Sequence, residues 1–388
     1  MLTFAKRNLL SIKICNMNPF IYGSIVKGNN FYDREIECKR IIDTLSGGNN
    51  IVLYAPRRFG KTSLVFKAME RLEQSGFICV YFDFMPVFST ESFVRLYSKA
   101  LAAKQGNLQK FAQTFSSLIK AIRPVLNFGI DGTPEFSLDF AGEKVDETTI
   151  SQLLDLTEVI AGTNKRVIVF FDEFQEIEKL ENINFEALLR SKMQQQEKTN
   201  YLFLGSKTHL LKQIFNDKKR AFYNAASQMT IGGLPEKDTI EHLQNRFAES
   251  NITINKEDIL YIISLTANIP YYIQLLAAEI WQYMINNCHV VTKEIIDIST
   301  VSLIEMKRDY YMELFDRQSK SKKQLLQALT KYGKNIFSID YIKANNLPSV
   351  GTLQRAASEL VNHGTIEKSG GDYFIADPFF KIFIERNT

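Results

Sequence analysis

The pattern of apolar and polar positions predicts strands that alternate with helices over residues 31–233. Short apolar runs recur, and most are followed by a stretch with apolar residues at helical spacing, such as the helix expected to end at Gly76. Alternating strands and helices are typical of a mostly parallel sheet, and strands that are apolar throughout indicate a sheet covered on both faces. The sequence therefore predicts an α/β fold with strands near residues 51–54, 77–84, 167–171, 201–205 and 228–234.

One stretch of this region has a different pattern. Residues 90–123 keep helical periodicity, but residues 128–142 alternate between apolar and polar positions around a turn that contains Gly and Pro. This alternation predicts a β-hairpin. We expect the hairpin to be an insertion on the α/β domain, within residues 124–146.

After Pro235 the pattern changes to helices only, which predicts a small helical lid domain over residues 234–316. The last stretch, 317–388, predicts three helices and then two short strands joined by Gly370 and Gly371, the outline of a winged helix-turn-helix. The expected organisation is an N-terminal segment (1–30), a core (31–233), the lid and the winged helix.

Composition excludes several classes of protein. No apolar run approaches the roughly 20 residues needed to span a bilayer, so no membrane partner is expected. The first 15 residues are interrupted by basic and polar positions, which argues against a signal peptide, and the true start is expected either at Met1 or at Met17. The four cysteines are far apart, so neither a disulfide framework nor a zinc site is indicated, and a reducing cytoplasm fits best.

The main candidate chemistry lies in residues 55–62, which read APRRFGKT and approach the GxxxxGK[ST] pattern of a phosphate-binding loop. In such a loop backbone N–H groups point at the phosphates, the lysine reaches the β and γ oxygens, and the hydroxyl ligates Mg²⁺. Ala55 replaces the usual first glycine, which is tolerable if its φ stays negative. The alternative is a basic strand-to-helix turn. ATP and Mg²⁺ are the expected cofactors, bound by Pro56, Arg57, Arg58, Phe59, Gly60, Lys61, Thr62 and Ser63.

A second motif completes the predicted site. The apolar run VIVFF ends in Asp172 and Glu173, an arrangement in which the first carboxylate holds magnesium and the second polarises the attacking water. Acidic pairs after strands also serve as helix N-caps, which is the alternative. We therefore expect Thr62 and Asp172 to hold the metal, and Lys61 and Glu173 to act in catalysis.

Two further positions have both a functional and a structural interpretation. Ser206 follows the strand at 201–205, where its side chain could touch the γ-phosphate or the lytic water, or could simply cap a helix. Pro270 begins a helix, where it could press on the adenine or could serve only as a first-turn proline.

Several segments in this order carry a family resemblance: NPFIYG, FYDREIE, APRRFGKTSL, VIVFFDEFQEI, FLGSKTHLLKQIF and IPYYIQLLA. The chain resembles the archaeal-type ATPase family, a STAND branch of the AAA-like P-loop NTPases. That resemblance implies an ATPase core, a helical lid and a C-terminal winged helix. It assigns phosphate binding to Lys61 and Thr62, the acidic pair to Asp172 and Glu173, and a polar γ-phosphate contact to Ser206. Ala55 departs from the family pattern, as does Asn268 in the lid motif that ends at Pro270.

The expected function is a slow, Mg²⁺-dependent ATPase that works as a conformational switch and reports its nucleotide state through the lid to the winged helix. The alternative is a nucleotide-sensing DNA-binding regulator with little hydrolysis, which would read bases with Gln354, Arg355 and His363. Residues 318–388 contain ten Lys or Arg and six Asp or Glu, so the chain's positive excess lies there. We expect either DNA or a protein as the partner of residues 317–388.

Overall fold

The computed structural model describes residues 17–26, 31–32, 34–129, 132–142, 144–180, 183–285 and 289–387. It contains two compact units. The sheet unit comprises Arg34–Arg57 and Lys61–Gly232, and the helical unit contains Arg58–Gly60 and the residues from Gly233 onward, together with the described residues before Asp33. Residues 1–16, on which the choice between Met1 and Met17 depends, lie outside the described ranges.

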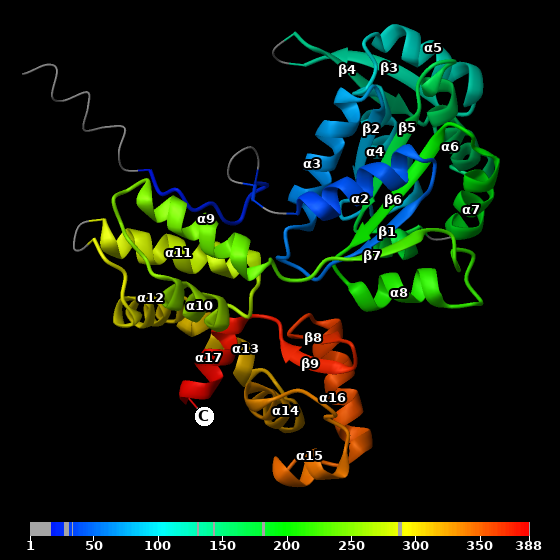
Figure 1. Ribbon diagram of the computed structural model, residues 1–388. Helices are drawn as coiled ribbons and strands as arrows, with labels where there is room; N and C mark the ends of the chain where they lie inside the picture. Colours follow the sequence, from blue (N-terminus) through cyan, green and yellow to red (C-terminus); the bar gives the residue numbers. More distant parts are fainter. Residues whose placement is uncertain are drawn as a thin grey trace, which may run out of the picture. The chain divides into compact units, whose positions relative to one another are not determined.

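The sheet unit is built on a five-stranded sheet in the order β2-β5-β6-β1-β7, in which every neighbouring pair is parallel (Figure 1). This arrangement confirms the predicted parallel α/β fold. β1, β5 and β6 are buried along their whole length, which explains why their sequences are almost entirely apolar. The strands are β1 (Ile51–Tyr54), β2 (Ile78–Asp83), β5 (Val167–Asp172), β6 (Thr199–Gly205) and β7 (Ser227–Thr230).

Helices and an aromatic core cover this sheet. Rings from the strands and from the adjoining segments pack edge to face, as Phe84 does against Phe171 with centroids 5.3 Å apart. The helical elements of the unit are α2 (Glu35–Ser46), α3 (Lys61–Gln74), α4 (Thr90–Ala102), α5 (Leu108–Leu118), α6 (Glu147–Ala161), the 3₁₀ helix η2 (Phe174–Lys179), α7 (Phe185–Gln195) and α8 (Thr208–Asn216).

A hairpin lies between α5 and α6. Its strands, β3 (Arg123–Phe128) and β4 (Pro134–Asp139), pair antiparallel, with Arg123 opposite Asp139. The hairpin begins earlier than the alternation at 128–142 indicated, and the helical part ends at Leu118. Pro124 is one reason for this boundary, because proline has no N–H to donate inside a helix.

The helical unit contains the remaining elements. α11 begins at Pro270, a residue suited to a first turn, and α10 is capped by Asn255, whose side chain accepts a hydrogen bond from the Asp258 N–H. The elements are α9 (Glu236–Ala248), α10 (Lys256–Leu265), α11 (Pro270–Met284), α12 (Lys293–Met306), α13 (Arg308–Asp316), α14 (Lys320–Lys331), α15 (Ile339–Ala344), α16 (Val350–Asn362), β8 (Ile366–Ser369), β9 (Asp372–Ile375) and α17 (Pro378–Asn387).

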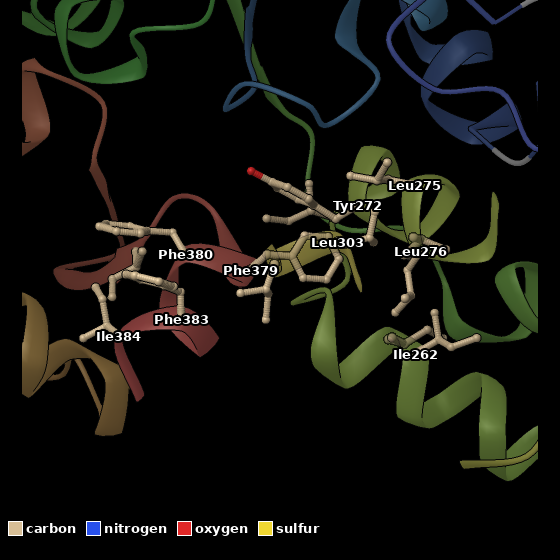
Figure 2. Close-up of a cluster of buried hydrophobic side chains, with 14 of the residues drawn as sticks. Ile262, Tyr272, Leu275, Leu276, Leu303, Phe379, Phe380, Phe383 and Ile384 are labelled. Atoms are coloured by element: carbon tan, nitrogen blue, oxygen red, sulfur yellow. The ribbon is translucent and has the colours of Figure 1, made fainter. Parts of the chain in front are cut away.

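A single hydrophobic cluster joins the α9–α12 helices to the winged-helix elements within this unit (Figure 2). Tyr272 of α11 meets Phe379 of α17 edge to face, with ring centroids 5.5 Å apart. Tyr311 of α13 packs on Phe380 and Phe383, which also belong to α17. Helix α17, which the sequence patterns did not predict, therefore supplies much of the contact between the two parts of the helical unit.

None of the helices in the described ranges combines the length and the apolar character needed to cross a membrane.

Candidate functional site

The candidate site gathers at the carboxyl edge of the central strands. The loop over residues 55–60 follows β1, Asp172 ends β5, and Ser206 follows β6. Since β6 lies between β5 and β1 and all three strands are parallel, their carboxyl ends reach the same edge of the sheet. In open α/β sheets ligands bind outside this edge.

The loop combines two residues of positive φ with a helix start that carries no acidic residue. Ala55 is buried and does not have positive φ, so alanine in place of the usual glycine introduces no backbone strain. Gly60 has φ of 77°, a region that favours glycine, and Arg58 also lies there with φ of 72°. Helix α3 starts at Lys61 with no acidic residue in its first turn. The positive end of that helix therefore favours an anion.

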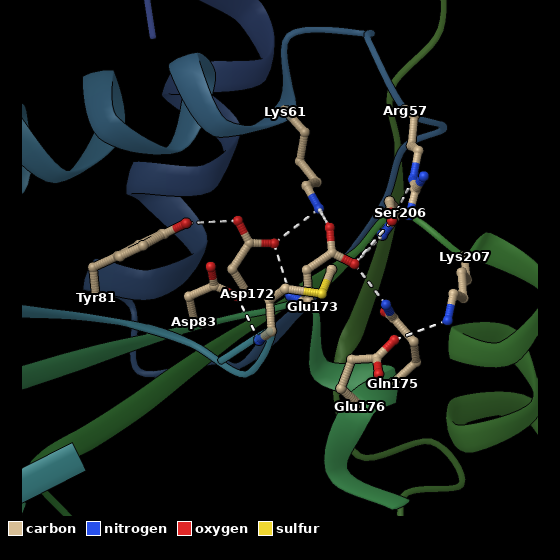
Figure 3. A network of polar contacts seen from close by, with 11 residues as sticks. Arg57, Lys61, Tyr81, Asp83, Asp172, Glu173, Gln175, Glu176, Ser206 and Lys207 are labelled. Carbon is tan, nitrogen blue, oxygen red and sulfur yellow. Dashed lines mark hydrogen bonds and ion pairs between the residues drawn. The ribbon is translucent and has the colours of Figure 1, made fainter. Parts of the chain in front are cut away.

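Lys61 joins the loop to the acidic pair (Figure 3). Its Nζ lies 2.8 Å from Asp172 Oδ1 and 3.3 Å from Glu173 Oε1. Lys61 is 7% exposed and Asp172 is 5% exposed, so the ion pair is shielded from water. Lys61 lies between two carboxylates that are 111 and 112 positions away in the sequence. The fold thus brings together the three residues that the two sequence motifs assigned to phosphate and metal chemistry.

Asp172 has further partners. The Tyr81 hydroxyl of β2 donates to Asp172 Oδ2 at 2.7 Å, and the Glu173 N–H donates to Asp172 Oδ1 at 2.8 Å. Burial and the neighbouring Asp172 raise the pKa of Tyr81, so its hydroxyl stays protonated and remains a donor. No sequence motif had assigned a role to Tyr81. The similarity of the segments YFDF and FFDE was a usable signal. β2 and β5 pair so that Asp83 lies directly alongside Asp172, which places the end of β2 beside the acidic pair.

Glu173 is held by several donors at once. Its Oε2 accepts hydrogen bonds from Gln175 Nε2 (2.5 Å), from Ser206 Oγ (2.8 Å) and from the Ser206 N–H (3.2 Å). Burial alone would raise the pKa of Glu173, but the charge of Lys61 and the hydrogen bonds from Gln175 and Ser206 outweigh it, and the pKa is lowered. The carboxylate is thus ionised at neutral pH.

Ser206 links Glu173 to the loop. Its Oγ accepts a hydrogen bond from Arg57 Nε at 3.3 Å while it donates to Glu173. The N-cap residue of α8 is Lys207, whose side chain makes no capping hydrogen bond. The Ser206 hydroxyl is therefore directed to the acidic pair, and the helix-cap alternative does not describe its contacts.

The other residues predicted to bind the nucleotide are placed as follows. Pro56 is half-buried in the loop, and Thr62 and Ser63 are half-buried in the first turn of α3. Phe59 belongs to the helical unit and packs against its core. Pro270 occupies the first turn of α11 in that same unit. A contact between Pro270 and an adenine stays a prediction.

Arg58 also belongs to the helical unit. Its guanidinium lies 4.8 Å from the Tyr272 ring centroid and 5.1 Å from that of Tyr271, and it approaches Asp377 Oδ2 at 3.5 Å. Asp377 immediately precedes α17. Arg58 thus touches both α11 and the start of α17.

The donors at the site suit magnesium. Among the described residues no group of three or more His, Cys, Asp or Glu side chains is arranged to hold a metal ion. Mg²⁺ commonly needs only one or two protein oxygens, because phosphate and water complete its octahedron. The Asp172 carboxylate and the Thr62 hydroxyl are oxygen donors of this kind.

Comparison with known proteins gives the family. The model of an ATPase domain found predominantly in Archaea matches residues 31–276, which is more than half of the chain. The chain belongs to this family. A second model, for a probable winged helix domain, matches residues 309–386 of this archaeal-type ATPase. The predicted family and the predicted fold, a P-loop core with a C-terminal winged helix, are both confirmed.

Two relatives of this chain come from archaea. An uncharacterised ATP-binding protein of Pyrococcus horikoshii is 24% identical over 261 residues, which cover 63% of this chain and 73% of that protein. An uncharacterised protein of Methanocaldococcus jannaschii is 22% identical over 380 residues, which cover 91% of this chain and 68% of that protein. A solved Walker-type ATPase of Pyrococcus abyssi superposes with a TM-score of 0.63 at 18% identity, covering 95% of this chain and all of that one. This last likeness concerns the fold.

Proposed function

We propose that this protein binds ATP with Mg²⁺, hydrolyses it slowly and uses the nucleotide as a conformational switch. The observation that carries the proposal is the convergence of Lys61, Asp172 and Glu173 within 3.3 Å at the end of a phosphate-binding loop. A lysine at this position of the loop supplies charge to β and γ oxygens, and an acidic pair after the neighbouring strand supplies a metal ligand and a base.

Each residue has a distinct role in this proposal. Lys61 leaves the carboxylates when ATP binds and contacts the phosphates, while the loop N–H groups and the start of α3 hold the phosphate oxygens. Asp172, oriented by Tyr81, and Thr62 would hold Mg²⁺, which would supply positive charge to the phosphate oxygens. Glu173 accepts the proton of the attacking water, and Ser206, itself held by Arg57, contacts the γ-phosphate or that water.

The same contacts support slow turnover. In the structure Lys61 is bound to both carboxylates, and Glu173 accepts four hydrogen bonds, counting the one from Lys61. A nucleotide must displace the lysine from this shielded ion pair before the phosphates gain their cation. Withdrawing Lys61 from Asp172 and Glu173 opposes productive binding and slows the catalytic cycle, as expected of a switch rather than a rapid motor.

We further propose that the nucleotide state passes through a lid, residues 234–316, to the winged helix, residues 317–388. Two observations within the helical unit support this path. The core is continuous from Tyr272, two residues after Pro270, to Phe379 of α17. Arg58 touches Tyr272 and also pairs with Asp377. A shift of either Pro270 or Arg58 would therefore change the contacts that Asp377 and Phe379 make at the start of α17.

Phosphate release by the purified protein tests the proposal. We expect inorganic phosphate to accumulate from ATP in the presence of Mg²⁺, and the rate to fall to background when EDTA removes the metal, because the positive charge that Mg²⁺ supplies between the phosphates and the Asp172 carboxylate is then lost. A malachite-green assay measures this. If purified protein that binds ATP released no phosphate with Mg²⁺ present, the hydrolytic part of the proposal would fail.

A second candidate is a nucleotide-sensing DNA-binding regulator with little hydrolysis. Helix α16, the third helix of the winged helix, exposes Gln354 and Arg355, and a winged helix places such a helix in the major groove. On the same helix Glu359 carries the opposite charge, although Lys322 pairs with it at 2.5 Å. This mixture of charges is compatible with two kinds of partner, the surface of another protein and the phosphate backbone of DNA.

A salt titration separates these two partners. If α16 binds DNA, affinity for a random duplex falls steeply as salt is raised from about 50 to about 200 mM, and Arg355→Ala weakens it, because each lysine or arginine on a phosphate releases counterions. Fluorescence anisotropy measures the affinity. Binding that is absent near 50 mM salt, in both the ATP-bound and nucleotide-free states, excludes this candidate and leaves a protein partner.

A further inference from the structure

Gln175 is a buried polar residue beside the acidic pair that no sequence motif identified. It lies in η2, two residues after Glu173, and is 3% exposed. Its Nε2 donates to Glu173 Oε2 at 2.5 Å (Figure 3). Its Oε1 is buried and has no hydrogen-bond partner among the described residues. An unpaired buried amide oxygen costs free energy. The contact between Gln175 Nε2 and Glu173 holds the side chain in this position against that cost.

The backbone of β6 makes room for this amide. Gly205, the last residue of β6, lies directly against it, and a Cβ on Gly205 would overlap Gln175 Oε1 and come within 3.2 Å of Gln175 Cδ. Gly205 does not have positive φ, so backbone conformation does not demand glycine there. Glycine is required there for a steric reason, because a side chain would collide with the amide of Gln175.

Glu173 itself needs an external support. It sits at φ 49° and ψ 41°, in the left-handed region that is unfavourable for a residue with a side chain. Lys61 contacts Oε1, whereas Gln175 and Ser206 contact Oε2. The two carboxylate oxygens therefore have separate partners, and only the Oε1 side depends on the lysine that ATP would withdraw.

We propose that Gln175 is a positioning residue that, together with the side-chain-free Gly205, anchors Glu173 Oε2 so that Oε1 faces the attacking water once Lys61 has moved to the phosphates. The inference rests on the proposed ATPase function for its kinetic consequence. Oε1 then takes the proton as the water oxygen bonds to the γ-phosphorus and the bond to the ADP oxygen breaks. Gln175 exchanges no proton and holds the base in place.

Kinetics of Gln175→Met test the anchor. Methionine keeps the length of the side chain but cannot donate, so we expect kcat to fall about 100-fold, the scale of a misplaced catalytic group. KM and the Kd for a fluorescent ATP analogue should stay unchanged, because Gln175 contacts neither Lys61 nor the loop in the structure. Equal losses in kcat and ATP affinity would show a general structural role and overturn the proposal.

Gly205→Ala tests the same anchor without altering Gln175. The added methyl meets the end of a flexible side chain, so the variant can fold with the glutamine displaced, and kcat should fall as it does in Gln175→Met. In a Gln175→Ala background the same glycine change should cost nothing further, since the group it displaces is gone. Gly232→Ala is the matched control, because its Cβ would meet no heavy atom within 4 Å. Full additivity of the two changes would contradict the proposal.

A measurement on the nucleotide-free protein separates this inference from the proposed function. The Ser206 N–H donates to the anchored oxygen, so its hydrogen exchange should accelerate about 10-fold or more in Gln175→Met and in Gly205→Ala as the carboxylate leaves. If exchange is faster in the variants but the wild-type protein does not hydrolyse ATP, the positioning role of Gln175 is supported and the proposed ATPase function is contradicted. Unchanged exchange in both variants, with wild-type hydrolysis intact, would reject the anchor alone.

Discussion

Replacing Lys61 with alanine is expected to weaken ATP binding about 100-fold or more, because two charge-assisted contacts to the phosphates, each contributing about 1.5–3 kcal/mol, are lost. Titration with a fluorescent ATP analogue measures the change. The same substitution leaves Asp172 and Glu173 close together without their cation, and removing one member of a buried ion pair typically costs about 3–5 kcal/mol of stability. We therefore also expect the unfolding midpoint of the nucleotide-free protein to fall.

Lys67→Ala is the matched control for this variant. Lys67 lies on the same helix, six residues further on, and pairs at 3.3 Å with Glu70, a surface contact of small energetic consequence. It should leave both ATP affinity and the unfolding midpoint close to wild type. Near-wild-type ATP affinity in a folded Lys61→Ala protein would show that the loop does not bind phosphate as proposed.

Glu173→Gln is expected to reduce ATP hydrolysis by about 1,000-fold, because the amide cannot accept the proton of the attacking water. Binding should survive and should tighten several-fold, because ATP no longer has to draw Lys61 away from the Glu173 carboxylate at 3.3 Å. Phosphate release measures the first effect, and titration with the fluorescent analogue measures the second. This combination would yield a form of the protein held with ATP, suited to capturing partners of residues 317–388.

Glu176→Gln is the control for Glu173→Gln. Glu176 lies three residues further along in η2 and pairs with Lys207 at 2.9 Å and with Lys179 at 3.1 Å. Loss of this charge should leave turnover near wild type, since Glu176 does not contact Lys61 or the loop. If Glu173→Gln hydrolyses ATP as fast as wild type, Glu173 is not the base, and the role of the acidic pair reduces to metal and lysine binding.

Much of the fold was predictable because buried parallel strands have a distinctive composition. A strand covered on both faces contacts only apolar neighbours, so VIVFFD and YLFLG are recognisable without their partners. Helix α17 was not predicted, although Asp377 and Pro378 carry a helix-start signal. The Asp377 side chain accepts hydrogen bonds from the N–H groups of Phe379 and Phe380, and proline suits the first turn.

The candidate site divides in a similar way. Gly60, Lys61, Thr62, Asp172 and Glu173 were predictable because phosphate and metal chemistry requires particular groups at fixed local spacing. Gln175 was not, because no local pattern marks its side chain, and the YFDF pattern around Tyr81 becomes informative only once β2 is known to pair with β5. Tyr81 reaches Asp172 only through the register of β2 on β5, and Gln175 reaches its position only because β6 ends in a glycine.

Hydrophobic periodicity and motif spacing are properties of short stretches of chain, so the sequence indicated most of the elements and the main chemical groups. Which of these groups meet depends on the tertiary structure. Lys61 pairs with residues 111 and 112 positions away, and Ser206 reaches Glu173 across 33 positions. Such contacts depend on strand order and register, which no local period encodes. The packing of α11 on α17 could not be read from the sequence for a similar reason. An apolar helix face shows that the helix is buried, but it does not show which element covers it.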